Sequence, residues 1–218
     1  MRQLASKWLK TKALLHHPYT AVFIPETCLY SEEQLRMMLG RHTFVFIKPV
    51  KGGGGSGVMR VAKERRGYTC TRMEKTYRFD HFKALVDGIN RLRIQRPYLI
   101  QQGIQLASIQ GRPVDYRVKV AKKGDKWVFR AVVARHARPG LVITNLCKGG
   151  TQLKGTEALR MIYSQRLATR KRREIADLTR RCIPVLERRF PGIGQLGFDY
   201  GLDQTGRVWI LEVNTRPQ

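Results

Sequence analysis

Two carboxylates and one amide stand close together near the end of the sequence, in the segment LGFDYGLDQTGRVWILEVNTRP. Asp199 belongs to the first of two alternating stretches, and Glu212 and Asn214 belong to the second. The short polar, glycine-containing turn at 203–206 predicts that the two stretches form an antiparallel hairpin. Carboxylate and amide oxygens are ligands that Mg²⁺ prefers. The hairpin therefore predicts a magnesium site that serves phosphates, and its alternative is an ordinary hairpin with a solvated polar face.

The register of this hairpin decides which side chains meet. With the turn centred on Gln204-Thr205, Leu202 pairs with Arg207 and Asp199 lies opposite Ile210. Glu212 is then a diagonal neighbour of Asp199 on the same face, about 7–8 Å away. Strict alternation places the core face of the second strand at Trp209, Leu211 and Val213, and the polar face at Val208, Ile210, Glu212 and Asn214.

A glycine-rich loop follows the apolar segment FVFIKP. Lys48 ends that segment, and Gly52, Gly53, Gly54 and Gly55 precede Ser56 and Gly57. Consecutive glycines allow backbone amides to approach an anion closely. The sequence lacks the GK[ST] of a phosphate-binding loop that opens a helix, and the next residues predict another strand. We therefore expect a flap over a triphosphate between antiparallel strands, or alternatively a flexible hairpin tip without a ligand.

Charged residues alternate with apolar residues in the middle of the chain. Asp115, Arg117 and Lys119 share one face of a predicted strand, and Arg135 ends the next strand. Arginine binds a carboxylate or an acyl phosphate through two parallel hydrogen bonds. A two-residue turn at Lys123-Gly124 would place Arg135 on the wrong face, so a β-bulge is required to bring the arginines together. The alternative is that each arginine is a solvated surface charge.

The sequence offers no convincing protein nucleophile. No Cys/His or Ser/His pair is apparent, and nothing places a base beside Cys147. The four cysteines are widely separated, without a CxxC pair, which indicates reduced structural thiols rather than a zinc site or a disulfide framework. Any reaction would therefore depend on positioning and electrostatics.

The elements that position these groups can be predicted from periodicity. Helices are expected at 6–15, 31–39, 81–92 and 168–189, with Ser31 as a helix start. Strands are expected at 44–48, 57–63, 68–73, 98–102, 115–121, 126–135, 195–202 and 207–214. Short glycine-containing turns between strands indicate antiparallel hairpins, so the fold class is α+β with sheets covered on one side by helices.

Composition is that of a globular but strongly basic protein. The chain has 218 residues, of which 42% are hydrophobic, and a formal net charge of +26. Such a charge attracts polyanions: nucleic acid, an anionic membrane, or an acidic protein or polymer. No apolar run approaches the roughly 20 residues of a membrane-spanning helix, and the N-terminus lacks the apolar core of a signal peptide. We therefore expect a soluble cytoplasmic protein.

Taken in order, the segments IPET, FIKP with its glycine loop, DYRV, NLCKGG and LEVNTRP resemble the ATP-grasp superfamily over nearly the whole chain. Within it, the sequence is most similar to the YheC/YheD family, described as endospore-coat-associated. DYRV, TNLCKGG and LEVN are also similar to ligases that add glutamate to the tail of a ribosomal protein. Such proteins usually carry a preceding substrate domain and continue beyond the metal motif, whereas this sequence leaves little room for the first and ends at Gln218.

The resemblance implies an ATP-grasp fold with the nucleotide between two lobes, an N-terminal lobe at 1–102 and a C-terminal lobe at 103–218. It also implies ATP and two Mg²⁺ ions as cofactors, with Mn²⁺ as an alternative metal. For the nucleotide, the resemblance implies phosphate contacts at Lys7 and Lys48, with Lys48 also on the adenine, a flap at Gly52 to Gly57, and an adenine hinge at Gln101, Gln102 and Ile104. For the metal, it implies ligands at Asp199, Glu212 and Asn214. For the substrates, it implies an acyl-phosphate clamp at Arg117, Arg135 and Asn145 and an acceptor loop at Gly149-Gly150.

The resemblance favours an enzyme, a carboxylate–amine ligase that acts through an acyl phosphate on a carboxylate substrate and an amine acceptor. The basic helix around residues 166–189 suggests an acidic peptide or polymer as acceptor, and the family suggests association with the spore. One alternative is a non-catalytic, nucleotide-binding coat or scaffold protein, although the three metal-binding residue types are intact. A second is a nucleic-acid-binding protein, which is less favoured because no nucleic-acid-binding module is recognisable.

Overall fold

The computed structural model describes residues 4–138 and 150–215, which form two compact units. One unit, here called unit 2, comprises Pro25–Gly103. The other, unit 1, comprises the described residues 4–24, 104–138 and 150–215. The units thus differ from the two lobes expected from the sequence, because the first 24 residues group with the C-terminal residues.

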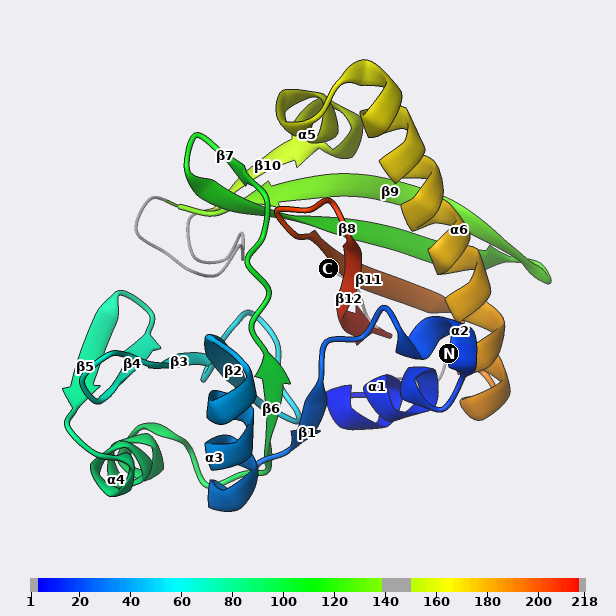
Figure 1. Ribbon diagram of the computed structural model, residues 1–218. Helices are drawn as coiled ribbons and strands as arrows, with labels where there is room; N and C mark the ends of the chain where they lie inside the picture. The colour runs from blue at the N-terminus through cyan, green and yellow to red at the C-terminus, as the bar shows by residue number, and fades with distance from the viewer. Residues whose placement is uncertain (1–3, 139–149, 216–218) are drawn as a thin grey trace. The chain divides into compact units, whose positions relative to one another are not determined.

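Unit 2 is a six-stranded antiparallel sheet with two helices (Figure 1). The strand order is β1-β6-β2-β3-β4-β5, so the first and last strands of the unit in sequence, β1 and β6, are neighbours. Its elements are β1 (Thr27–Leu29), α3 (Glu32–Arg41), β2 (Phe44–Pro49), β3 (Met59–Lys63), β4 (Tyr68–Arg72), β5 (Lys75–Phe79), α4 (Phe82–Leu92) and β6 (Tyr98–Gln102).

Both helices of unit 2 begin with a capping side chain and bury one face. Ser31 accepts a hydrogen bond from the Gln34 N–H, which confirms the predicted helix start, and His81 caps α4 in the same way. Apolar residues of α3 and α4 form one buried cluster with alternate residues of the sheet, among them Val45 and Ile47. The helices therefore cover one face of the sheet, and the glycine loop joins β2 to β3 at its end.

Unit 1 is built on a second antiparallel sheet, with the strand order β10-β9-β8-β11-β12 and the short β7 paired to β8. The hairpin β8–β9 contributes its two longest strands, and β11–β12 adds the C-terminal hairpin (Figure 1). Its elements are α1 (Lys7–Leu15), α2 (Pro18–Ala21), β7 (Ser108–Ile109), β8 (Arg112–Lys123), β9 (Lys126–His136), β10 (Thr151–Lys154), α5 (Gly155–Ile162), α6 (Gln165–Arg189), β11 (Gln195–Leu202) and β12 (Val208–Asn214).

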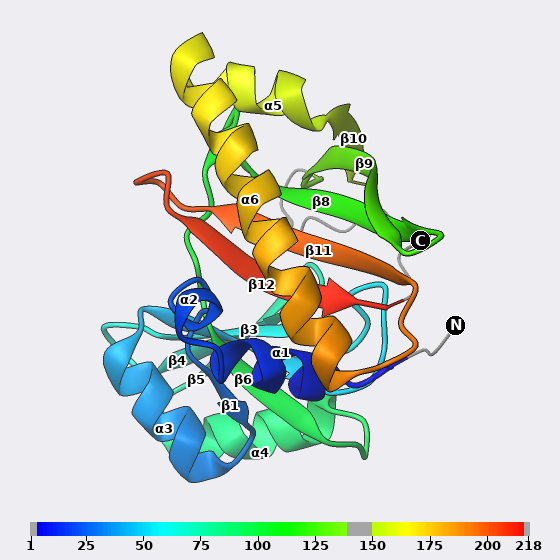
Figure 2. The same ribbon diagram turned by 90° about the vertical axis from the view of Figure 1, so that its right-hand side faces the viewer.

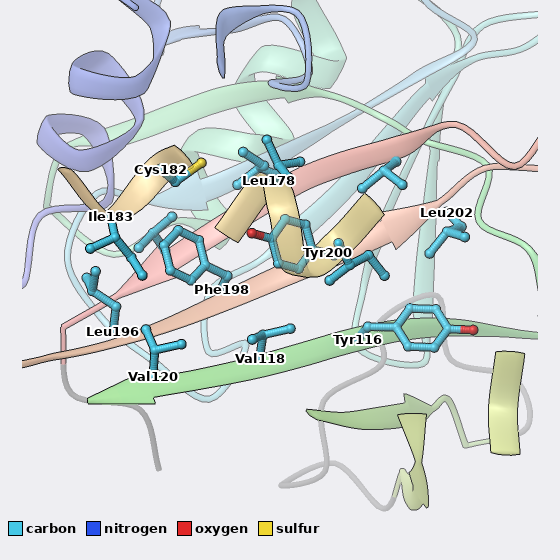
Figure 3. Packing of buried hydrophobic residues seen from close by; sticks show 14 of the residues in the cluster. Tyr116, Val118, Val120, Leu178, Cys182, Ile183, Leu196, Phe198, Tyr200 and Leu202 are labelled. Carbon is cyan, nitrogen blue, oxygen red and sulfur yellow. The ribbon is translucent and has the colours of Figure 1, made fainter. Parts of the chain in front are cut away.

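Helix α6 crosses the strands of this sheet and covers one of its faces (Figure 2). Leu178 and Cys182 of α6 pack against alternate residues of β8 and β11, such as Val118 and Phe198 (Figure 3). A buried hydrogen bond of 2.8 Å joins the hydroxyls of Thr179 and Tyr200 across this layer. Because side chains alternate along a strand, the residues between these apolar ones point to the opposite face.

The predicted fold class and most predicted elements are confirmed. The four expected helices are present, and α6 begins at Gln165 rather than at 168. The helices α2 and α5 and the strands β1, β5, β7 and β10, all of which are short, were missed in the sequence analysis. A short segment carries few periods, so its sequence pattern is weak.

The described cysteines are free thiols, in agreement with the sequence. Burial raises the pKa of Cys70 to about 12 and that of Cys182 to about 12, so both are neutral and unreactive at physiological pH. Cys147 lies outside the described residues. Within the described ranges, no helix is both long and apolar enough to cross a membrane.

We expect Phe198→Ala to lower the free energy of unfolding by about 3–5 kcal/mol, because this ring is fully buried beneath α6. Leu211→Ala is the matched control: Leu211 is only half-buried and should give a clearly smaller loss. Urea denaturation followed by circular dichroism measures both values. Equal losses would mean that Leu211 belongs to the same core.

Candidate functional site

A β-bulge in the C-terminal hairpin brings Asp199 directly opposite Glu212. Tyr200 pairs with Ile210, whereas Asp199 pairs with Glu212, so Leu211 is the extra residue on β12. Directly opposed residues of an antiparallel pair share a face of the sheet. The two carboxylates therefore lie on the sheet face that is not covered by α6.

The register expected from the sequence was wrong in two respects. Leu202 pairs with Val208 instead of Arg207, and the bulge then shifts the remaining pairs by one more residue. Val208 and Ile210 consequently belong to the buried core beneath α6, although strict alternation assigned them to the polar face. Glu212 was placed on the correct face, but as a diagonal neighbour of Asp199 rather than its direct partner.

A second bulge aligns the arginines of β8 and β9. Val120 pairs with Phe129 and Lys119 with Ala131, so one residue of β9 is unpaired between them. Beyond this bulge Arg135 stands directly opposite Asp115, on the face that also carries Arg117. The bulge that the sequence required, but could not reveal, is therefore present.

Four charged side chains from three strands form one buried network on this face. Arg117 donates two hydrogen bonds to Asp199, with Nε to Oδ1 at 2.7 Å and Nη2 to Oδ2 at 2.8 Å. Arg135 makes the same two-point contact with Asp115, at 2.7 and 2.5 Å. The Nη2 atom of Arg135 also lies 3.1 Å from Oδ2 of Asp199. The alternative that these arginines are solvated surface charges is thereby excluded.

The network favours the charged state of Asp199 and of Arg135. Burial alone would raise the pKa of Asp199, but Arg135 and the hydrogen bonds and charge of Arg117 lower it below its ordinary value. Burial likewise acts to lower the pKa of Arg135, and the charges of Asp199 and Asp115 raise it instead. The result is a charged pair, Arg135 and Asp199, in which each group stabilises the charge of the other.

Helix α1 adds two lysines beside the edge strand of the same sheet. The Nζ atom of Lys7 lies 2.9 Å from Oε1 of Glu212. Lys10, one turn further along the helix, is almost fully buried and donates to the carbonyl oxygen of Leu4. Burial lowers the pKa of Lys10 to about 8, with Glu212 raising it and Lys7 lowering it further. Lys7 is thus close to a predicted metal ligand.

The predicted metal ligands share one face and suit Mg²⁺ in their donor chemistry. Asn214 follows Glu212 by two residues and pairs with Gly197 on β11, a residue without a side chain. Two carboxylates and an amide oxygen are the donors that Mg²⁺ takes. Within the described residues, no cluster of three His, Cys, Asp or Glu is arranged to hold a metal. Instead, cationic side chains pair with Asp199 and Glu212, so a metal would compete with arginine and lysine.

In unit 2 the glycine loop has a backbone that only glycine adopts easily. Gly52, Gly54, Gly55 and Gly57 all have positive φ, between 65° and 129°. A Cβ atom on Gly57 would lie 3.1 Å from Pro49 Cγ, so a side chain there would also be crowded. Gly53 and Ser56 complete this exposed turn between the antiparallel strands β2 and β3, as expected.

Lys48 lies at the base of this loop and is held by β6. Its Nζ atom donates to Oε1 of Gln101 at 2.6 Å. The backbone N–H of Gln102 donates to the carbonyl of Glu26 at 2.8 Å, so this donor is already used within unit 2. Ile104 is the first residue of unit 1 after β6, and its assignment to an adenine hinge stays a prediction.

Two of the predicted roles stay predictions. Asn145 and Gly149 lie outside the described residues. Conversely, the sequence-based reading gave no role to Asp115 or Lys10. Asp115 was detectable, because it stands two residues before Arg117 in an alternating strand, whereas the burial of Lys10 leaves no signal in sequence.

The fold recurs in solved structures of low sequence identity. The crystal structure of N5-carboxyaminoimidazole synthase from Aspergillus clavatus in complex with ADP and 5-aminoimidazole ribonucleotide aligns with a TM-score of 0.57 and 13% identity, covering 100% of this chain and 46% of that one. D-alanyl-alanine synthetase A from Vibrio cholerae aligns with a TM-score of 0.53 and 13% identity, covering 91% and 52%. The fold is therefore the ATP-grasp fold.

Sequence comparison defines the family within this class. The YheC/D-like ATP-grasp family model matches residues 2–218, and the chain belongs to this family. It is 31% identical over 223 residues to the endospore coat-associated protein YheD of Bacillus subtilis, covering 97% of this chain and 48% of YheD. It is 24% identical to the endospore coat-associated protein YheC of the same organism, covering 99% of this chain and 61% of YheC. The chain thus spans about half of one relative and three fifths of the other.

We expect Lys10→Met to change how stability depends on pH. Between about pH 8 and 10.5 the unfolded lysine stays protonated while the folded one loses its proton, so the unfolded state binds more protons and Lys10 favours folding increasingly as pH rises. The free energy of unfolding of the variant, relative to the wild type, should therefore fall across this range. Denaturation at pH 7.5, 8.5 and 9.5 measures the free energy of unfolding, and Lys12→Met, at an exposed lysine, is the control. If the free energies of unfolding of Lys10→Met and the wild type changed in parallel with pH, the burial of a charge at this position would be contradicted.

Proposed function

We propose that this protein is an ATP- and Mg²⁺-dependent carboxylate–amine ligase. The observation that carries the proposal is the buried network on unit 1, in which two arginines and two carboxylates are fixed on one sheet face beside Glu212. Membership of the YheC/D-like ATP-grasp family supports nucleotide chemistry. Two proteins of the same fold, a synthase and a synthetase by name, support a reaction of this class by analogy.

The proposed reaction has two balanced steps. A carboxylate oxygen of the substrate attacks the γ-phosphorus of ATP, the bond from that phosphorus to the bridging oxygen breaks, and ADP leaves with the electron pair. An amine then attacks the carbonyl carbon of the acyl phosphate, the carbon–oxygen bond breaks, and phosphate leaves. The amine proton passes to solvent, so the protein needs no nucleophile of its own.

Each unit supplies different groups to this reaction. In unit 2 the amides of the glycine loop and Lys48 would bind the phosphates, and Gln101 would hold Lys48 in place. In unit 1 Arg117 and Arg135 would bind the acyl phosphate, with Asn145 as a third contact by resemblance. Guanidinium donors aimed at the acyl phosphate would stabilise the charge that develops in the transition state.

Asp199, Glu212 and Asn214 would hold Mg²⁺, with Lys7 as a further phosphate contact. When bound, Mg²⁺ would neutralise the negative charge on the phosphates. In the structure Lys7 pairs with Glu212, and Arg117 pairs with Asp199. On binding of the metal ion, the lysine and the arginine beside these carboxylates would be replaced. The released lysine and arginine would then be available to the phosphate oxygens.

We also propose an acidic peptide or polymer as the acceptor. The chain carries a net charge of +26, and α6 has nine arginines and lysines against three acidic residues. The helix covers the sheet face opposite the network, so its arginines would act through the long-range field rather than by contact. Such a field raises association rates and is screened by salt.

A second candidate function is a nucleotide-binding protein of the spore coat without catalysis. The names of the relatives, which are endospore coat-associated, favour association with the spore. Nucleotide binding without turnover would separate this candidate from the ligase.

MgATP should stabilise the protein, because a ligand that binds only the native state raises the melting temperature. We expect a higher melting temperature with ATP and Mg²⁺ together than with ATP alone, and loss of this difference in Glu212→Gln. Glu187→Gln, a carboxylate that pairs with Lys122 away from the network, is the matched control. No shift at millimolar MgATP in the wild type would refute nucleotide binding.

Turnover should depend on the acceptor and on salt. We expect ADP release with an acidic acceptor peptide to exceed that with a neutral or basic peptide at low salt, and this advantage to shrink at high salt. A coupled ADP assay with mass spectrometry of the product tests the ligase. Binding of MgATP without product from any carboxylate and amine would favour the coat protein, and tight duplex DNA binding with a steep salt dependence would favour a nucleic-acid-binding protein.

A further inference from the structure

Unit 1 contains a pocket on the sheet face opposite the buried network. It has a volume of about 320 Å³ and lies among α6, α5 and the strands β8 and β9. Tyr116 and Val118 line it, and these residues alternate along β8 with Asp115 and Arg117 of the network. The sheet therefore separates this pocket from the residues proposed to bind nucleotide and metal.

The floor and walls of the pocket are apolar. Besides Tyr116 and Val118 they include Val132 of β9, Leu159 of α5 and Ile175 of α6. The volume is near the lower end of the range of small-molecule sites, roughly 300–1,000 Å³. Apolar side chains of this kind favour binding of a ligand that buries an apolar body against them.

The rim of the pocket is cationic. Arg172, Arg173 and Arg180 line it together with a single acidic residue, Asp177. Arg180 is already paired with Asp177 at 2.7 Å and stacks over Phe129, 5.3 Å from the ring centre. Neither Arg172 nor Arg173 has an ion-pair partner among residues 4–138 and 150–215. Two uncompensated positive charges thus stand at the mouth of an apolar pocket.

One lining residue also has an unsatisfied polar group. The hydroxyl of Tyr116 is buried and has no hydrogen-bond partner among the described residues. A buried hydroxyl nearly always has a hydrogen-bond partner. A hydroxyl without one in the lining of a pocket therefore favours a bound ligand that supplies the partner.

We propose that this pocket binds a small amphiphilic monocarboxylate, with its apolar body between α6 and the sheet and its carboxylate on Arg172 and Arg173. The guanidinium group binds a carboxylate in preference to a neutral or cationic head. This site is independent of the proposed ligase activity and lies on the other face of the sheet.

Octanoate is the probe, with 1-octanol and octylammonium as matched neutral and cationic molecules. Titrations followed by amide chemical shifts should show octanoate binding with one-to-one stoichiometry and about tenfold tighter than octanol, with the largest shifts in α6, β8 and β9. Octylammonium should bind more weakly than either. Equal affinity for octanoate and octanol, or no binding of octanoate, would overturn the proposal.

Two variants test the two halves of the pocket. Arg172→Ala/Arg173→Ala should reduce octanoate affinity about tenfold and leave octanol affinity unchanged within about twofold. Ala176→Leu fills the pocket from a half-buried position on α6 and should weaken both ligands. Arg188→Ala/Arg189→Ala removes the same charge from the exposed end of α6 and should change neither. If the control lowers octanoate affinity as much as the pocket variant does, the binding reflects general charge and the site is refuted.

A last titration separates this site from the nucleotide site. Octanoate affinity should be the same with and without saturating MgATP, because the sheet lies between the two sets of residues. Competition between them would place octanoate at the nucleotide site and refute a separate pocket. A protein that bound octanoate but not MgATP would instead retain this proposal and lose the proposed ligase function.

Discussion

Four charges are buried on one face of the unit 1 sheet, and they are tolerated there only because each is paired. An isolated buried charge costs several kcal/mol even after the protein relaxes around it. The ion pairs of Asp199 with Arg117 and Arg135 offset this cost, and Arg135 also pairs with Asp115. The three strands that carry these residues must therefore keep one register, since a shift of a single residue would move a charge into the apolar core.

This constraint divides the unit into two chemically different layers. The side chains that alternate with the network, such as Val118 and Phe198, form the core beneath α6 (Figure 3). The same sheet therefore provides a rigid apolar support on one side and a fixed set of charges on the other. Charges gathered on one face suit a reaction in which phosphate is transferred and released, because they lie close together before the substrates bind. The network thus links the stability of the sheet to the proposed chemistry.

Unit 2 would meet a different requirement of the proposed reaction, that of a backbone that can approach phosphate closely. Its sheet and two helices form a core of their own, and the glycine loop projects from the β2–β3 hairpin. Positive φ at Gly52, Gly54, Gly55 and Gly57 makes the loop unlike an ordinary tight turn. The ion pair of Lys7 with Glu212 and the hydrogen bond of Lys48 with Gln101 hold both lysines in defined places. In both units, neighbouring polar groups orient the residues proposed to bind phosphate.

The sequence by itself determined the residue types of the site and the elements that carry them. Alternation along 195–202 and 115–121 revealed strands with one polar face, and the glycine run revealed a loop with unusual backbone needs. These signals are local, because they depend only on the period of a strand and on the side chain of glycine. Short glycine-containing turns between the predicted strands indicated the α+β class, and the motifs FIKP, DYRV, NLCKGG and LEVNTRP carried the resemblance to the ATP-grasp superfamily.

Only the tertiary structure decided which of these residues meet. The extra residues at Leu211 and between Phe129 and Ala131 bring Glu212 opposite Asp199 and Arg135 opposite Asp115. A bulge interrupts alternation at a point set by the pairing of distant strands, so the sequence around it looks like an ordinary strand. The burial of Lys10 and the pocket beneath α6 likewise arise from contacts between segments far apart in the chain. Local pattern specifies which face a side chain takes within a regular strand, whereas the packing of the whole sheet determines where that regularity breaks.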